Sequence, residues 1–256
     1  MAWLMSGGLD GEERTSWTAI AWFVASGLLA TVGGRITMFK SIEFAGVVRA
    51  STTRRLIPFL SLFLSWLFMG ESVSALAGGG MVLIALSFAI LFWDNRSRIR
   101  ILTDDPQRRA MISRGLAFGV ISALLYANSL IARQFGLIDK PDAFFGALIG
   151  AVTAIFYYAC AASVSAKYRL IVRAALTAPD PWQLLAALLI SLGQLAQFGA
   201  LMFTGAGMVA FLNSFEIYIS AFLAVFVLRT EPMPGRAVIG ATALATTGVM
   251  LMAIRF

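Results

Sequence analysis

Ionisable side chains inside long apolar stretches are the residues of this sequence that could do chemistry. Arg54 and Arg55 stand just before Pro58 in one such stretch, and Glu216 stands in another. A charged group is costly inside a lipid bilayer, so each of these residues is a functional hypothesis by default. A guanidinium binds carboxylate or phosphate through paired hydrogen bonds. Because the apolar stretches hold more arginines than carboxylates, we predict a site for an anionic or zwitterionic solute.

Glu216 is the expected partner of these arginines. It shares one helix face with Asn213 and Ser220, since the spacing is three and four residues. In a medium of low dielectric an unpaired carboxylate takes up a proton more readily than it stays charged. Glu216 is therefore either an ion-pair partner of Arg54 or Arg55, or a proton carrier coupled to transport. A purely structural salt bridge is an equally good interpretation.

Polar side chains also recur at helical spacing in other apolar stretches. Ser122, Tyr126, Ser129 and Arg133 lie on one face, and Gln194 and Gln197 lie on another. Hydrogen bonds between helices would explain the glutamines equally well, each worth on the order of 1 kcal/mol. The predicted residues of a solute-binding cavity are Arg35, Arg54, Arg55, Tyr126, Arg133, Gln194, Gln197, Asn213 and Glu216.

The composition places these residues in a membrane. Of the 256 residues, 59% are hydrophobic and 13% are charged, whereas a soluble domain has about 25% charged residues. Apolar runs long enough to cross a bilayer recur, and in lipid such runs must be helical. Histidine is absent and Cys160 is the single cysteine, so we expect no metal site, no cofactor and no internal disulfide. We interpret the net charge of +7 as lysines and arginines that set the membrane topology beside anionic lipids. We expect no nucleic acid as a partner.

Eight membrane-spanning helices are predicted. They cover residues 17–37, 47–69, 76–93, 115–132, 144–166, 182–203, 208–228 and 237–254. A basic, hydrophilic stretch over residues 94–114 is predicted to be a linker loop, and residues 167–178 are amphipathic and basic. The sequence therefore predicts an all-α integral membrane protein.

The chain also repeats itself with a shift of about 160 residues. The shift aligns Trp22 with Trp182, Gly33 with Gly193, and Glu71 with Glu231. Weak internal symmetry of this kind is typical of transporters built from inverted repeats, whose substrate site lies between the repeats. Residues 17–93 form an incomplete first repeat of three helices, and residues 115–256 form a complete second repeat of five. We predict an inverted-repeat helical bundle.

One motif resembles a known family. The stretch RASTTRRLIPFLSLFLSWLFMGESV has a proline inside an apolar run and closes with Gly70 and Glu71. The second copy, GAGMVAFLNSFEIYISAFLAVFVLRTEP, keeps Glu231 but has Thr230 and Tyr218 in place of the glycine and the proline. This pattern resembles the EamA-like branch of the drug/metabolite transporter superfamily. The resemblance implies two inverted five-helix repeats around a central cavity that carries small metabolites, amino acids or drug-like compounds.

Compared with the two five-helix repeats of that family, this sequence lacks the first two helices. We expect either a natural three-plus-five variant or, with preference, a chain that lost two helices through truncation or a misassigned start. The predicted function is secondary transport or export of small metabolites or drug-like solutes. One alternative is a membrane subunit or truncated product that does not transport on its own and needs helper helices or a homodimer. A membrane-embedded lipid-processing enzyme is less favoured, because the sequence has no histidine base and no HExxH or nucleophile-elbow motif.

Lysine and arginine are concentrated on one side of the predicted topology. That side holds Lys40, Arg96, Arg98, Arg100, Arg108, Arg109, Lys167, Arg169, Arg173, Arg229 and Arg236. The positive-inside rule places it in the cytoplasm and both termini outside. The family resemblance implies the opposite orientation. We expect a multi-pass protein of a bacterial inner membrane.

Overall fold

All elements that the structure describes are helices. The computed structural model describes residues 17–46, 50, 53–54, 56–70, 76, 78–80, 82–83, 85–87, 89–90, 93, 105–177, 179–213 and 236–253. The first helix has three parts: α1 (Trp17–Ser26), the π-helix η2 (Gly27–Gly34) and α2 (Arg35–Ala45). The later helices are α4 (Leu56–Met69), α6 (Pro106–Asp139), α7 (Ala143–Val164), α8 (Ala166–Thr177), α9 (Pro181–Phe203), α10 (Ala206–Asn213) and α12 (Arg236–Ala253).

Four of the described helices are long and apolar enough to cross a membrane. They cover Trp17–Ala45, Pro106–Asp139, Ala143–Val164 and Pro181–Phe203. These helices confirm an all-helical fold and coincide with four of the eight predicted spans. The shorter α4 falls within the predicted span 47–69, and α10 and α12 overlap the predicted spans 208–228 and 237–254, starting two residues and one residue earlier. Residues 214–235 lie outside the described part.

Three predicted boundaries are wrong, and one of them is the end of span 115–132, since α6 continues to Asp139. The first helix continues past residue 37 to Ala45 and ends at Gly46, whose φ of 85° favours glycine. Helix α6 begins at Pro106, so residues 106–114, which we predicted as part of a linker loop, are helical. The Asp105 carboxylate accepts a hydrogen bond from the Gln107 backbone N–H at 2.9 Å and so caps this helix. With 34 residues α6 is about 51 Å long, so it extends well beyond a hydrocarbon core about 30 Å thick.

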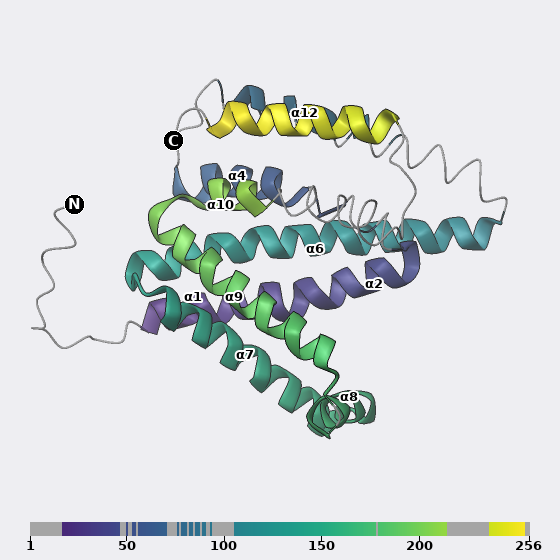
Figure 1. The fold of residues 1–256 in the computed structure, drawn as a ribbon, viewed down its shortest axis with the longest axis vertical. Helices are drawn as coiled ribbons and strands as arrows, with labels where there is room; N and C mark the ends of the chain where they lie inside the picture. Colours follow the sequence, from purple (N-terminus) through teal and green to yellow (C-terminus); the bar gives the residue numbers. More distant parts are fainter. Residues whose placement is uncertain are drawn as a thin grey trace, which may run out of the picture.

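Helix α6 is the centre of the bundle. It packs against α1, η2, α2, α4, α9 and α10 (Figure 1). Glycines on α6 permit close approach: a Cβ at Gly115 would lie 2.7 Å from the Ala45 side chain, and one at Gly136 would lie 2.5 Å from the Phe23 ring. Small residues at helix contacts are the usual way in which membrane helices approach one another.

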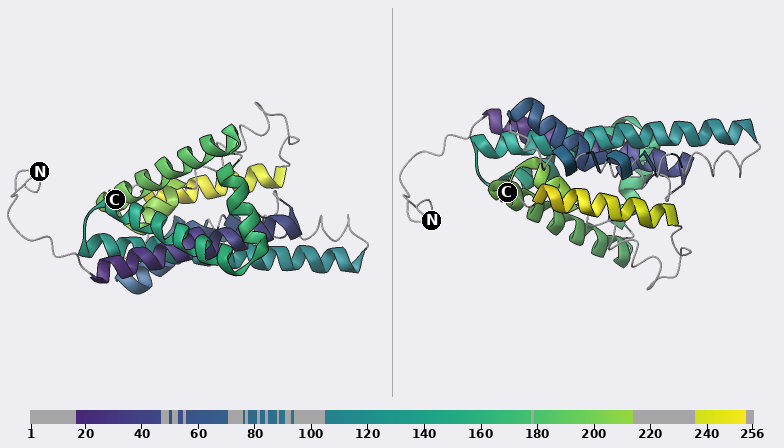
Figure 2. Two further views of the ribbon diagram at one scale, coloured as in Figure 1. Left: turned by 90° about the horizontal axis from the view of Figure 1, so that it is seen from below. Right: turned by 90° about the horizontal axis from the view of Figure 1, so that it is seen from above.

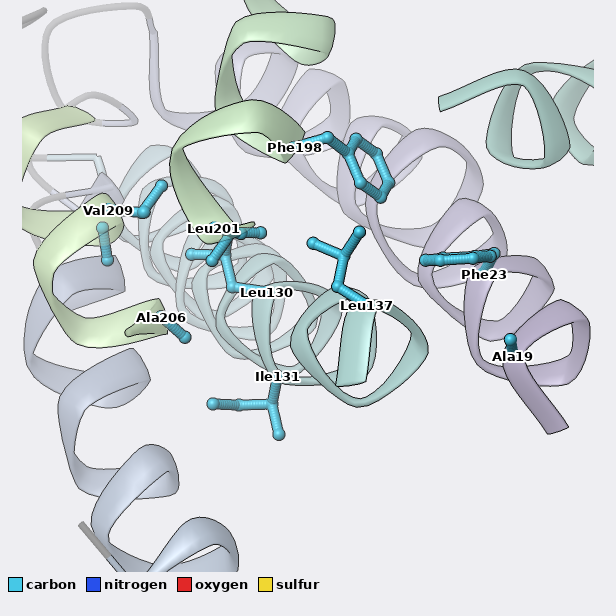
Figure 3. Close-up of a cluster of buried hydrophobic side chains, with 10 residues drawn as sticks. Ala19, Phe23, Leu130, Ile131, Leu137, Phe198, Leu201, Ala206 and Val209 are labelled. Atoms are coloured by element: carbon cyan, nitrogen blue, oxygen red, sulfur yellow. The ribbon is translucent and has the colours of Figure 1, made fainter. Parts of the chain in front are cut away.

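A cluster of apolar side chains fills the space between α1, α6, α9 and α10 (Figure 3). The Phe23 ring is completely buried there. It contacts the rings of Phe145 and Phe198 edge-on, with centroid distances of 6.2 and 5.9 Å. On the outside of the bundle, large apolar side chains of α7 and α9 such as Ile155 and Leu188 are exposed. An exposed apolar surface of this kind is what a lipid-facing helix presents.

The π-helix η2 interrupts the first helix in the middle of the bundle. Two hydroxyl groups donate to carbonyls at its C-terminal end: Ser122 donates to the Gly34 carbonyl at 2.8 Å, and Thr37 donates to the Gly33 carbonyl at 2.7 Å. The Gly34 backbone lies directly against the Tyr126 ring, so a Cβ at this position would come within 3.1 Å of it. This contact brings Arg35 beside α6.

Helices at equivalent positions of the two sequence repeats are in contact with one another. Phe23 of α1 meets Phe198 of α9, and the Ser61 hydroxyl of α4 donates to the Ala206 carbonyl of α10 at 3.3 Å. A third contact joins Ser87 to α12, because the Ser87 hydroxyl donates to the Ala241 carbonyl at 2.6 Å. The first helix and α9 run in opposite directions, as do α4 and α10 (Figures 1 and 2).

Candidate functional site

Arg133 is a buried cation in the middle of the bundle. Its side chain is only 3% exposed. Its Nε donates to the Ser26 hydroxyl at 3.0 Å, and its Nη1 donates to the Gln197 side-chain carbonyl. The guanidinium also lies over the Phe198 ring, 4.7 Å from the centroid. Helices α1, α6 and α9 thus meet around one guanidinium group.

Two further arginines lie in this region. The positive charges of Arg35, Arg54 and Arg133 all act on the Tyr126 hydroxyl, and the charge of Arg35 also acts on Arg133. Tyr126 lies two helical turns before Arg133 on α6, so both side chains leave the same face. We call Arg35, Arg54, Tyr126, Arg133 and Gln197 the arginine cluster. Its members come from four helical segments.

The carboxylates that the structure describes lie away from this cluster, at helix ends. They are Glu43, Asp105, Asp139, Asp142 and Asp180. Asp105, Asp142 and Asp180 accept hydrogen bonds from backbone N–H groups in the first turns of α6, α7 and α9. Their negative charges therefore serve helix capping. Within the described residues, Arg133 is hydrogen-bonded only to neutral oxygens.

The structure brings together five of the nine predicted site residues, those of the arginine cluster. Gln194 is half-buried one turn before Gln197 and makes no hydrogen bond within the described part of the chain. Asn213 is exposed at the end of α10. Arg55 and Glu216 lie outside the described residues, so their roles stay predictions.

Two contacts of Arg133 were missed by the sequence reasoning. Ser26 and Phe198 each touch its guanidinium, but Ser26 is not at helical spacing from a predicted residue of the site, and Phe198, four residues after Gln194, is apolar. Ser26 is separated from Arg133 by 107 residues. Its position immediately before the glycine-rich segment Gly27–Gly34 is a local signal that could have drawn attention to it.

Gln197 and Gln194 allow a matched test of the cluster's structure. We expect Gln197→Leu to lower the free energy of unfolding by about 2 kcal/mol, because it removes a neutral acceptor from a buried guanidinium. Gln194→Leu, on the same helix, is expected to change stability by less than about 0.5 kcal/mol. Thermal unfolding of both variants in detergent measures the difference. Equal stabilities of the two variants would show that the Gln197 contact contributes nothing.

Comparison with known proteins identifies the first part of this bundle. Residues 1–93 match the EamA-like transporter family. The predicted resemblance is confirmed over this stretch, which contains α1, η2, α2 and α4 and contributes Arg35 and Arg54 to the arginine cluster. A search of curated proteins gives no match.

The apolar helices indicate an integral membrane protein, and residues 1–93 match a family of membrane transporters. Members of the EamA-like family are transporters and not enzymes, which is consistent with the predicted absence of catalysis. The rest of the arginine cluster, Tyr126, Arg133 and Gln197, lies beyond the matched residues. Its role must therefore be argued from geometry and charge.

Proposed function

We propose that this protein is a secondary transporter that carries small metabolites or drug-like solutes of anionic or zwitterionic character. The observation that carries the proposal is the buried guanidinium of Arg133, whose described acceptors are all neutral. A buried charge is strongly destabilising unless it is compensated. A carboxylate or phosphate group of a solute would compensate this charge and accept the remaining N–H groups in pairs.

The other members of the arginine cluster have compatible roles. Arg35 and Arg54 add positive charge beside Tyr126, so a bound anion would be attracted by more than one guanidinium. The Tyr126 hydroxyl and the Gln197 amide can each donate a hydrogen bond to the neutral part of a solute. We propose that Arg55, Gln194, Asn213 and Glu216 complete the cavity, with Glu216 as an ion-pair partner or a proton carrier.

The proposed architecture is a bundle of eight helices in two inverted repeats, three helices followed by five, with the solute cavity between them. The three contacts between equivalent helices support it, because helices that lie near a two-fold axis contact their counterparts across that axis. The opposite directions of α4 and α10 also support it (Figure 1). Two-fold rotation about an axis in the membrane plane reverses the direction of every helix. We propose the inner membrane of a bacterium as the location.

A transport assay with one amino acid and two of its derivatives, which differ in net charge, tests the function. An amino acid, its N-acetyl derivative and its amide present a zwitterion, an anion and a cation of similar size. In proteoliposomes loaded with each unlabelled compound, we expect saturable counterflow of the anion or the zwitterion and not of the cation. Vesicles without protein are the control. Preferred transport of the cation, or no protein-dependent flux of any compound, would contradict the proposal.

The second candidate is a membrane subunit that transports only together with a partner. Every residue from Pro181 to Gly193 of α9 is exposed, which leaves a long apolar face for a second copy or for helper helices. In the same assay this candidate predicts a flux per protein that rises with the protein-to-lipid ratio. A flux per protein that is independent of this ratio favours transport by the single chain.

A further inference from the structure

Helix α8 is placed differently from the other described helices. It follows α7 after a break at Ser165, whose backbone is extended with φ −119° and ψ 123°. In Figure 1 α8 is seen nearly end-on beside the ends of α7 and α9, whereas the long helices lie along the page. The helix therefore runs across the end of the bundle. A helix at this place lies near the boundary between lipid and water.

Arg169 fixes α8 to the end of α7. Its Nε donates to the Ala162 carbonyl at 3.2 Å, and its Nη2 donates to the Ser163 carbonyl at 3.1 Å. These carbonyls are among the last of α7 and have no partner within that helix. Tyr168 adds a ring contact with Tyr158, at a centroid distance of 6.3 Å. Arg169 and Tyr168 of α8 thus contact the end of α7.

The remainder of α8 is exposed. It has no buried residue, and Leu170, Ile171 and Leu176 are 68%, 54% and 78% exposed. Lys167 and Arg173 are also exposed, and the segment AKYRLIVRAALT contains no acidic residue. Exposed apolar side chains beside unopposed positive charges are the composition of a helix that lies on an anionic membrane surface.

The positive charge of α8 complements anionic lipid head groups, which attract lysine and arginine within a Debye length of the membrane.

We propose that α8 is an interfacial helix that binds the head groups of anionic phospholipids through Lys167 and Arg173. Leu170 and Ile171 enter the boundary of the acyl chains, while Arg169 holds the helix to α7. This inference does not depend on the transported solute. It rests on the exposure and charge of α8 and on its position at the end of the bundle.

A probe on α8 tests this inference in the full-length protein. Ala174 is exposed, so Ala174→Cys in a Cys160→Ser background accepts an environment-sensitive nitrobenzoxadiazole label. We expect blue-shifted emission in vesicles that contain phosphatidylglycerol, compared with phosphatidylcholine alone, and weakening of the shift at high salt. Lys167→Gln and Arg173→Gln should each lower the apparent affinity for phosphatidylglycerol about fivefold, and together about 25-fold.

Lys140→Gln is the matched control, because Lys140 lies at the other end of the bundle, between α6 and α7. We expect this variant to retain the full response to phosphatidylglycerol. The inference is overturned if the emission is the same in both lipids, or if the double variant responds like the unmodified protein. It is also overturned if the emission follows the protein-to-lipid ratio and not the lipid charge, since a second copy would then cover α8.

Discussion

Arg133→Gln is expected to reduce transport of an anionic solute about 100-fold. The substitution removes the guanidinium that is 3% exposed and held between Ser26, Gln197 and Phe198. A paired, charge-assisted hydrogen bond to a solute carboxylate contributes about 3 kcal/mol in such a site, which corresponds to the expected loss. The measurement is counterflow of the anionic compound in proteoliposomes with equal amounts of folded protein.

Two further variants separate charge from geometry. Arg133→Lys keeps the charge but loses the planar fork, so we expect an intermediate loss of transport. Arg114→Gln changes an exposed arginine of the same helix and should leave transport unchanged. The proposed role of Arg133 would be refuted by a stable Arg133→Gln protein that carries anions at the normal rate.

Gly136→Leu is expected to lower the free energy of unfolding by about 3 kcal/mol or more. Even a Cβ at this position would lie 2.5 Å from the Phe23 ring. The ring cannot move aside, because it is completely buried between Phe145 and Phe198, and Gly146 also approaches it closely. Overpacking of a filled core costs about 1–3 kcal/mol, and a whole leucine side chain lies at the upper end.

Gly193→Leu provides the comparison for this substitution. Gly193 lies on the exposed part of α9, and no atom of the described residues would lie within 4 Å of a Cβ there. We expect Gly193→Leu to be neutral or stabilising, because leucine favours a helix by about 0.8 kcal/mol relative to glycine. Thermal unfolding in detergent compares the two variants. If both unfold at the same temperature, α6 and α1 do not approach each other as closely as the structure places them.

The sequence predicts the positions of helices well where hydropathy determines them. Residues 144–166 and 182–203 were predicted as spans, and α7 and α9 cover nearly the same residues. The prediction of a loop is wrong at residues 106–114, because charged side chains there do not interrupt the helix. A helix that leaves the bilayer can carry such side chains in water, and the cap at Asp105 fixes where it begins.

The sequence by itself determined which faces of the helices are polar. The spacing of Ser122, Tyr126, Ser129 and Arg133 places them on one side of α6 whatever surrounds that helix. Only the tertiary structure decided what this side meets. Ser26 and Gln197, 107 and 64 residues away along the chain from Arg133, reach its guanidinium because the glycines of α6 let α1 approach and because α9 crosses the same core. Helical periodicity is a local property of the backbone, whereas the choice of a partner helix depends on packing between distant segments, which the hydropathy of each segment does not encode.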